Sequence, residues 1–147
     1  MARIVWEFRQ PREKVWMAIM NAELWPVGFV DFSPTAGAKF RSKLIPTAGT
    51  NYTGTLLCEV LEAVDFQSLS VRIYAQRRGA PPTLWEIRSE LTDKDTGGTS
   101  AVMNVYGTNA DEPEERILLN ILGAVTRWIY GRAEKDLGSA DSESAAQ

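Results

Sequence analysis

The chain contains no histidine, and its 147 residues include a single cysteine, Cys58. Without histidine there is no Ser–His or Cys–His nucleophile pair and no imidazole ligand for a metal ion. One cysteine forms neither an internal disulfide nor a thiolate cluster, and no acidic loop of the calcium-binding type is present. These absences exclude many hydrolase and metalloenzyme classes, and we predict neither a metal nor a cofactor.

The sequence also lacks a large excess of either positive or negative charge. It carries 16 Lys and Arg against 19 Asp and Glu, a net charge of -3. Two of the acidic residues, Asp141 and Glu143, lie in the polar segment 138–147, so the rest carries -3 + 2 = -1. A nearly neutral body without a block of basic residues is a poor match for nucleic acid, and we predict no nucleic-acid partner.

Long apolar runs are missing as well. No stretch approaches the roughly 20 apolar residues that a transmembrane helix needs, and the first residues lack the apolar core of a secretory signal. We therefore expect a cytoplasmic protein with no membrane span. The apolar fraction of 44% and the charged fraction of 24% are ordinary for one globular domain with a substantial core.

Period-two alternation of apolar side chains predicts strands at residues 3–9, 38–44, 52–64, 69–76, 83–92 and 100–108. Helical spacing predicts short helices at 11–20 and 22–25 and one long amphipathic helix at 112–137, capped by Asn109 or Asp111. The fold class expected is α+β: a curved antiparallel sheet of about six strands wrapped around the C-terminal helix. Residues 1–137 form the domain, and 138–147 are expected to be a disordered polar tail.

The stretch PREKVWMAIMNAELW at residues 11–25 resembles the Pro-x-x-x-Val-Trp-x-Ala segment and following Leu-Trp of the START-like, or SRPBCC, superfamily. Gly37-Ala-Lys-Phe40 lies where such proteins often have Gly-Gly-x-Phe, and Val60-Leu-Glu62 resembles their Val-x-Glu strand. The likeness covers roughly residues 3–137 and is nearest the Hsp90-ATPase-activator-like and polyketide-cyclase-like branches. It implies a helix-grip fold whose cavity, between sheet and helix, binds a small hydrophobic molecule. The chain has Val105-Tyr106-Gly107 where many relatives have His-x-Gly.

Alternation also indicates which strand residues face the long helix, because successive side chains point to opposite sides of a sheet. The inward face is almost wholly apolar, and Glu62 is the one carboxylate assigned to it. Together with the helix stripe and the aromatic residues after the first helix, this face gives the expected ligand-binding residues: Trp6, Phe8, Trp25, Phe29, Phe40, Leu56, Cys58, Val60, Val71, Ile73, Trp85, Ile87, Met103, Val105, Leu118, Leu122, Val125 and Trp128.

Three functions remain open at this point. The first is binding of a small hydrophobic molecule, such as a lipid, an aromatic compound or a polyketide. The second is a cyclase- or dehydratase-like enzyme in which Glu62 or a tyrosine, Tyr52 or Tyr106, moves a proton. The third is a protein-binding module like an Hsp90 activator, with a protein partner or a homodimer contact. We assign no catalytic residue, and we interpret Cys58 as a buried, inert thiol.

Overall fold

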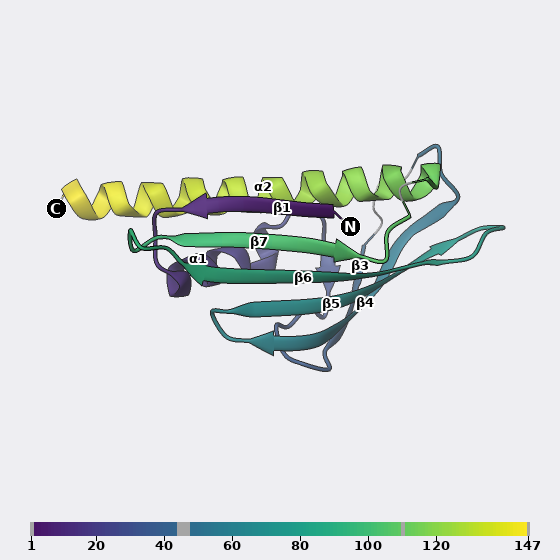
Figure 1. Ribbon diagram of the computed structural model, residues 1–147, viewed down its shortest axis with the longest axis horizontal. Helices are drawn as coiled ribbons and strands as arrows, with labels where there is room; N and C mark the ends of the chain where they lie inside the picture. The colour runs from purple at the N-terminus through teal and green to yellow at the C-terminus, as the bar shows by residue number, and fades with distance from the viewer. Residues whose placement is uncertain (1, 44–47, 110, 147) are drawn as a thin grey trace.

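The computed structural model describes residues 2–43, 48–109 and 111–146 of the chain. Its elements follow in the order β1 (Ala2–Phe8), α1 (Arg12–Ile19), the 3-10 helix η1 (Ala22–Leu24), β2 (Phe29–Val30), β3 (Lys39–Ser42), β4 (Tyr52–Val64), β5 (Ser68–Arg77), β6 (Thr83–Asp93), β7 (Thr99–Tyr106) and α2 (Pro113–Ala146). Figure 1 shows α2 running along the length of the sheet beside β1.

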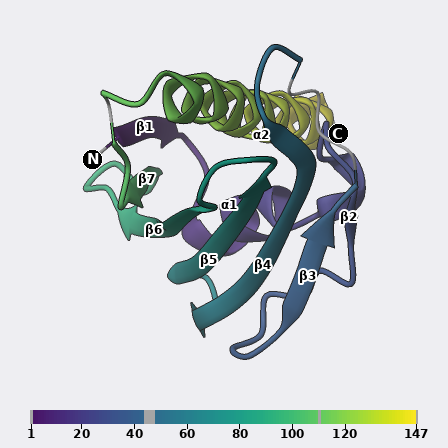
Figure 2. The same cartoon turned by 90° about the vertical axis from the view of Figure 1, so that its right-hand side faces the viewer.

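The strands form one antiparallel sheet in the order β1-β7-β6-β5-β4-β3-β2. It curls around α1 and α2, so that β1 lies beside one flank of α2 and β2 and β3 lie on the other side (Figure 2). The predicted helix-grip α+β fold is confirmed. The sheet has one strand more than expected, since the short β2 falls in a segment without strand periodicity. The strand predicted at 38–44 is observed at Lys39–Ser42, and its last residue, Leu44, is outside the described residues.

The long helix begins at Pro113, whose missing N–H suits the first helical position. A carboxylate caps it: Oε2 of Glu112 accepts a hydrogen bond from the backbone N–H of Glu115 at 2.6 Å. The predicted caps are therefore replaced, and Asn109 instead accepts from the N–H of Asp111 at 3.1 Å. At its other end α2 continues to Ala146, through most of the segment expected to be a polar tail. Disorder of that tail in solution stays a prediction.

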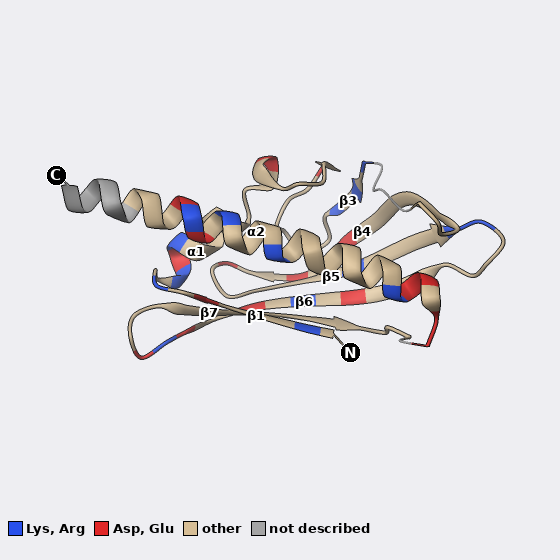
Figure 3. Ribbon diagram, turned by 90° about the horizontal axis from the view of Figure 1, so that it is seen from above, with Lys and Arg blue, Asp and Glu red and all other residues tan. Residues whose placement is uncertain are grey.

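An ionic cluster fastens the first turn of α2 to the end of the sheet. Nη1 of Arg77, on β5, lies 2.9 Å from Glu112 and 3.5 Å from Glu114, and the Arg77 side chain is only 9% exposed. Its Nε donates to the carbonyl of Pro81 at 2.8 Å. Figure 3 shows acidic residues gathered at this end of the helix, where the helix dipole favours negative charge. The cluster fixes where the helix starts over the sheet.

The assignment of Glu62 to the inward face is wrong. Val60 pairs with Val71, but Glu62 pairs with Ser70, so the register shifts by one residue within β4. Such a bulge places one extra residue in the strand and reverses the face on which later side chains lie. Val60 is therefore buried, whereas Glu62 is exposed. The convex face carries a cross-strand ion pair, with Arg72 3.5 Å from Glu59.

The core lies between the concave face of the sheet and the two helices. Trp85, Phe8, Leu118, Val15, Val60 and Val105 are each less than 2% exposed. Under the first turns of α2, the Trp85 indole N–H donates to Glu115 at 2.9 Å. None of the helices in the described part of the chain is long and apolar enough to span a bilayer.

Candidate functional site

Beneath the middle of α2 the packing leaves a hollow of about 140 Å³. Strands β4 to β7 form its floor, α2 its roof, and the end of α1 with the segments around β2 and β3 its side. The residues that line it are Ile19, Met20, Trp25, Phe29, Phe32, Phe40, Leu56, Leu69, Val71, Ile73, Ile87, Ser89, Met103, Leu122, Val125, Thr126, Ile129 and Tyr130. None of these side chains is charged, so the hollow is suited to a neutral guest.

Four rings form one side of the hollow; we call Trp25, Phe29, Phe32 and Phe40 the aromatic wall. Neighbouring ring centroids are 4.7–5.6 Å apart, and the interplanar angles range from 56° to 90°. These are tilted and edge-to-face arrangements, which the ring quadrupole favours. The Trp25 indole N–H donates to the carbonyl of Ile19 at 2.8 Å and so ties the wall to the end of α1.

Three hydroxyl groups interrupt the apolar lining. Thr126 donates to the carbonyl of Leu122, one turn earlier in α2, at 2.8 Å. Tyr130 is 4% exposed, and burial raises the pKa of its phenol to about 12, although its hydrogen bond with Ser89 acts in the opposite direction. The phenol is therefore neutral at any ordinary pH. Among the described residues that line the hollow, no carboxylate or amine is present to take or give a proton.

The structure brings ten of the predicted ligand-binding residues to the hollow. They come from the segment between η1 and β2, from each of the strands β2 to β7 and from α2, which the curled sheet gathers around one space. They are Trp25, Phe29, Phe40, Leu56, Val71, Ile73, Ile87, Met103, Leu122 and Val125. Their role in binding a ligand stays a prediction.

Eight predicted residues lie elsewhere. Phe8, Cys58, Val60, Trp85, Val105 and Leu118 are buried in the surrounding core. Trp6 is half-buried, and its indole N–H donates to Glu134 at 2.6 Å. Trp128 is 45% exposed and borders a small cleft with Leu24 and Trp25, so it lies at the edge of α2 and not on its buried face. Alternation and helical period identify the inward face of an element, but only packing separates a residue that fills the core from one that borders a void.

The remaining eight lining residues were not among the predicted site residues. Leu69 and Ser89 belong to the strand faces that alternation turns inward, and Ile129 belongs to the apolar stripe of the long helix. Thr126 and Tyr130 continue the row Leu118-Leu122 at intervals of four residues, which lie on one face of a helix. A stripe defined by purely apolar residues omits them, although tyrosine and threonine are often buried when hydrogen-bonded.

Cys58 is buried beside the hollow, and burial raises the pKa of its thiol to about 12. The thiolate is the reactive form, and it is scarce in the folded protein until the pH approaches that value. We expect alkylation by iodoacetamide at pH 8 to be slower than in the urea-unfolded chain by a factor on the order of a hundred or more. Mass spectrometry over time measures both rates, and equal rates would contradict the burial of this thiol.

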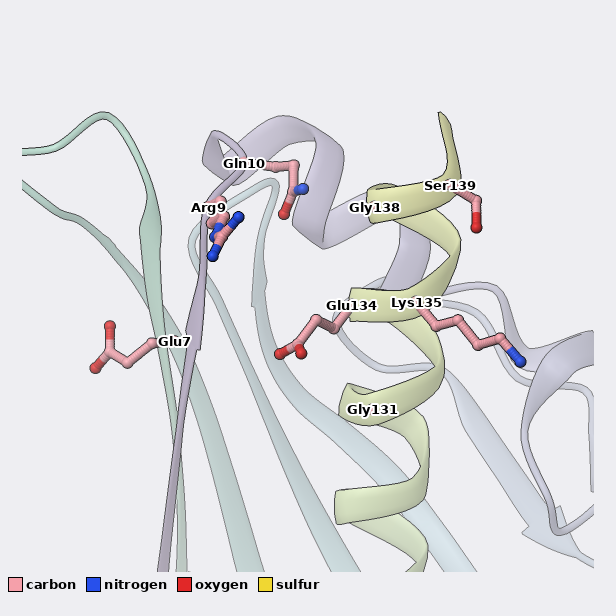
Figure 4. A pocket seen from close by; sticks show the side chains of 8 residues that line it. All are labelled: Glu7, Arg9, Gln10, Gly131, Glu134, Lys135, Gly138 and Ser139. Carbon is pink, nitrogen blue, oxygen red and sulfur yellow. The ribbon is translucent and has the colours of Figure 1, made fainter. Parts of the chain in front are cut away.

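A second, more open depression lies between the end of β1 and the later turns of α2 (Figure 4). Its volume is about 850 Å³, larger than the hollow, but polar and charged side chains line it, among them Glu7, Arg9, Glu134 and Lys135. Ligand sites are usually lined by mostly apolar residues with a few polar groups. The lining of the hollow, although its volume is smaller, fits that description, and the lining of the second depression does not.

Comparison with protein-family models gives no match, and comparison with the curated proteins gives none either. Solved structures do resemble the chain. Protein MLL2253 from Mesorhizobium loti has 26% sequence identity and a TM-score of 0.66 over 94% of this chain and 98% of its own. Ara h 8.0201 has 14% identity and a TM-score of 0.64 over 94% and 97% of the two chains. These structures share the helix-grip α+β fold of this chain.

A further solved structure is DynU16, described as a putative protein in the dynemicin biosynthetic locus. It has 18% identity and a TM-score of 0.60, and the match covers 87% of this chain but 46% of DynU16. Sequence identities this low establish the shared fold alone. They do not establish a shared function, because one fold carries many unrelated functions. The function has to be argued from the hollow itself.

Proposed function

We propose that this protein binds a small, mostly hydrophobic molecule in the hollow between the sheet and α2. The observation that carries the proposal is the lining: every described residue around the hollow is apolar except Ser89, Thr126 and Tyr130. Burial of apolar surface there supplies the binding free energy, at roughly 25 cal/mol per Å² before ordering costs. The solved structures with the same fold include one from a biosynthetic locus for a natural product, which accords with a carbon-rich guest.

The size of the hollow limits the guest. An apolar cavity of about 150 Å³ holds one benzene molecule, and this hollow is close to that size. As it stands it therefore accommodates about one aromatic ring. A longer lipid or polyketide would need the aromatic wall or the middle of α2 to move outward.

Toluene is a suitable first probe because it offers only apolar surface of one ring. With a Kd on the order of 1 mM, toluene at a few times that concentration should raise Tm by about 2–4 °C. Thermal unfolding followed by circular dichroism, with and without toluene, measures the shift. An unchanged or lowered Tm across the soluble range of toluene would contradict the proposal.

The cyclase- or dehydratase-like alternative has less support. Glu62 is exposed on the convex side, Tyr106 is 40% exposed, and the Tyr52 hydroxyl is hydrogen-bonded to Thr83 at 2.6 Å, outside the hollow. None of these candidate proton carriers lines the hollow. An enzyme of this kind would have only the hydroxyl groups of the lining to work with, and turnover unchanged by Glu62→Gln would remove that carboxylate from any mechanism.

The protein-binding alternative, including a homodimer or an Hsp90-activator-like role, has one feature in its favour. Leu57, Tyr74 and Leu84 lie side by side on neighbouring strands of the convex face and are 49%, 36% and 56% exposed. Exposed apolar rows of this kind occur at protein contacts. Sedimentation of the native chain, and binding assays with a chaperone middle domain, test the alternative directly.

A further inference from the structure

One part of the hollow differs from the rest, because two hydroxyl-bearing side chains line it from facing elements. Ser89 lies on β6 and Tyr130 on the facing side of α2, and we call them the hydroxyl pair. The ring of Tyr130 is held in place by Trp6 and Phe8, each with its centroid 6.2 Å away. The phenolic oxygen is therefore presented by a fixed side chain and not by a mobile one.

Counting donors indicates what the hydroxyl pair can offer a guest. The two groups carry two hydroxyl hydrogens, and a hydrogen bond between them uses one. The second hydrogen and the acceptor positions on both oxygens then remain for a guest molecule. The Thr126 hydroxyl differs, since its hydrogen is already donated to the carbonyl of Leu122 at 2.8 Å. Among the described lining residues, the hydroxyl pair is thus the place where a guest oxygen gains a donor.

The charge of the guest is limited by the same lining. No cationic side chain borders the hollow in the described chain, and a carboxylate moved there would lose its hydration without gaining an ion pair. A hydroxyl or carbonyl group loses much less and is compensated by a hydrogen bond. The site therefore discriminates between an acid and an alcohol of the same shape.

We propose that the guest is a neutral, ring-containing molecule with one hydroxyl or carbonyl oxygen, and that Ser89 and Tyr130 select it by hydrogen-bonding that oxygen. This proposal rests on the proposed function and specifies the ligand class of the same site. The aromatic wall contacts the ring, and the hydroxyl pair sets the orientation of the guest. Ser89 and Tyr130 are then specificity-determining residues in a site whose affinity comes mainly from apolar contact.

Three probes of nearly the same shape test the proposal: toluene, p-cresol and 4-methylbenzoate, titrated at pH 7 by calorimetry. The wild-type protein should bind p-cresol about threefold to tenfold more tightly than toluene, as expected of one net hydrogen bond. It should bind 4-methylbenzoate at least about tenfold more weakly than toluene. Binding of the benzoate as tight as that of toluene would overturn the proposal.

Within one variant, the ratio of the p-cresol affinity to the toluene affinity reports on the hydroxyl pair. A general change in packing alters both affinities alike and leaves the ratio unchanged. In the double variant Ser89→Ala/Tyr130→Phe, which removes both hydroxyl groups, the preference for p-cresol should fall to about one or below. Tyr74→Phe is the matched control, because Tyr74 is an exposed tyrosine on the convex face, and it should keep the wild-type ratio. A preference that survives in the double variant, while it remains folded, would overturn the proposal.

The results with toluene and p-cresol distinguish a failure of the hydrophobic site from a failure of the hydroxyl pair. If toluene binds but p-cresol is not preferred, the hydrophobic site stands and the role of the hydroxyl pair is wrong. If neither toluene nor p-cresol binds, the proposed function fails and this inference fails with it.

Discussion

Replacing Trp85 by alanine is expected to lower the free energy of unfolding by about 3–5 kcal/mol. Trp85 is 1% exposed, and its indole N–H donates to Glu115 at 2.9 Å, so the change leaves a large cavity and removes that hydrogen bond. Native proteins are stable by only about 5–15 kcal/mol, and the loss is therefore a large part of the total. Urea unfolding followed by circular dichroism measures it.

The matched control makes the same substitution at a tryptophan that the structure places differently. Trp128 is 45% exposed at the edge of α2, and Trp128→Ala should change the free energy of unfolding by less than about 1 kcal/mol. The sequence alone assigns both residues to the inward side. Equal losses for the two variants would contradict the exposed placement of Trp128 and with it the orientation of α2 on the sheet.

Filling the hollow is expected to remove its ligand. Val125 lies on α2 and borders the space, so the indole of Val125→Trp takes up much of a volume of about 140 Å³. We expect the affinity for toluene to fall at least about tenfold and the toluene-dependent rise in Tm to disappear. The variant should still fold, at a cost of no more than about 1–3 kcal/mol for overpacking.

Ile117→Trp is the control for this variant. Ile117 lies on the same helix, is 40% exposed and does not border the hollow, so the substitution adds the same ring on the outside. It should leave the toluene response as in the wild type. If Val125→Trp retains the full response while folded, toluene binds elsewhere and the assignment of the site is wrong.

Much of the fold could be predicted from local patterns, namely the period-two alternation of strands and the apolar spacing of helices. The alternation at residues 69–76 and 100–108 is regular, and the observed β5 and β7 differ from those ranges by only one or two residues at each end. Local pattern fails where the backbone departs from the ideal strand. At Leu61 the bulge in β4 moves Glu62 to the outside, and nothing in the alternation of Leu56, Cys58 and Val60 signals it.

The site was predicted less completely than the fold, for a related reason. A void is the small difference between the space that the backbone encloses and the volume of the side chains within it, and both terms depend on the whole structure. Trp85 and Ile87 lie on the same strand face, yet Trp85 fills the core while Ile87 borders the hollow. Periodicity assigns both residues to one side and does not separate their roles.

Methyl NMR during a titration with toluene tests the central claim most directly, because it reports where the guest lies. We predict saturable shifts of the methyl resonances of Ile73, Ile87 and Leu122, which surround the hollow, and no shifts at Leu57 and Leu84 on the convex face. Shifts confined to Leu57 and Leu84, or no saturable shift at any of the five residues, would contradict the account.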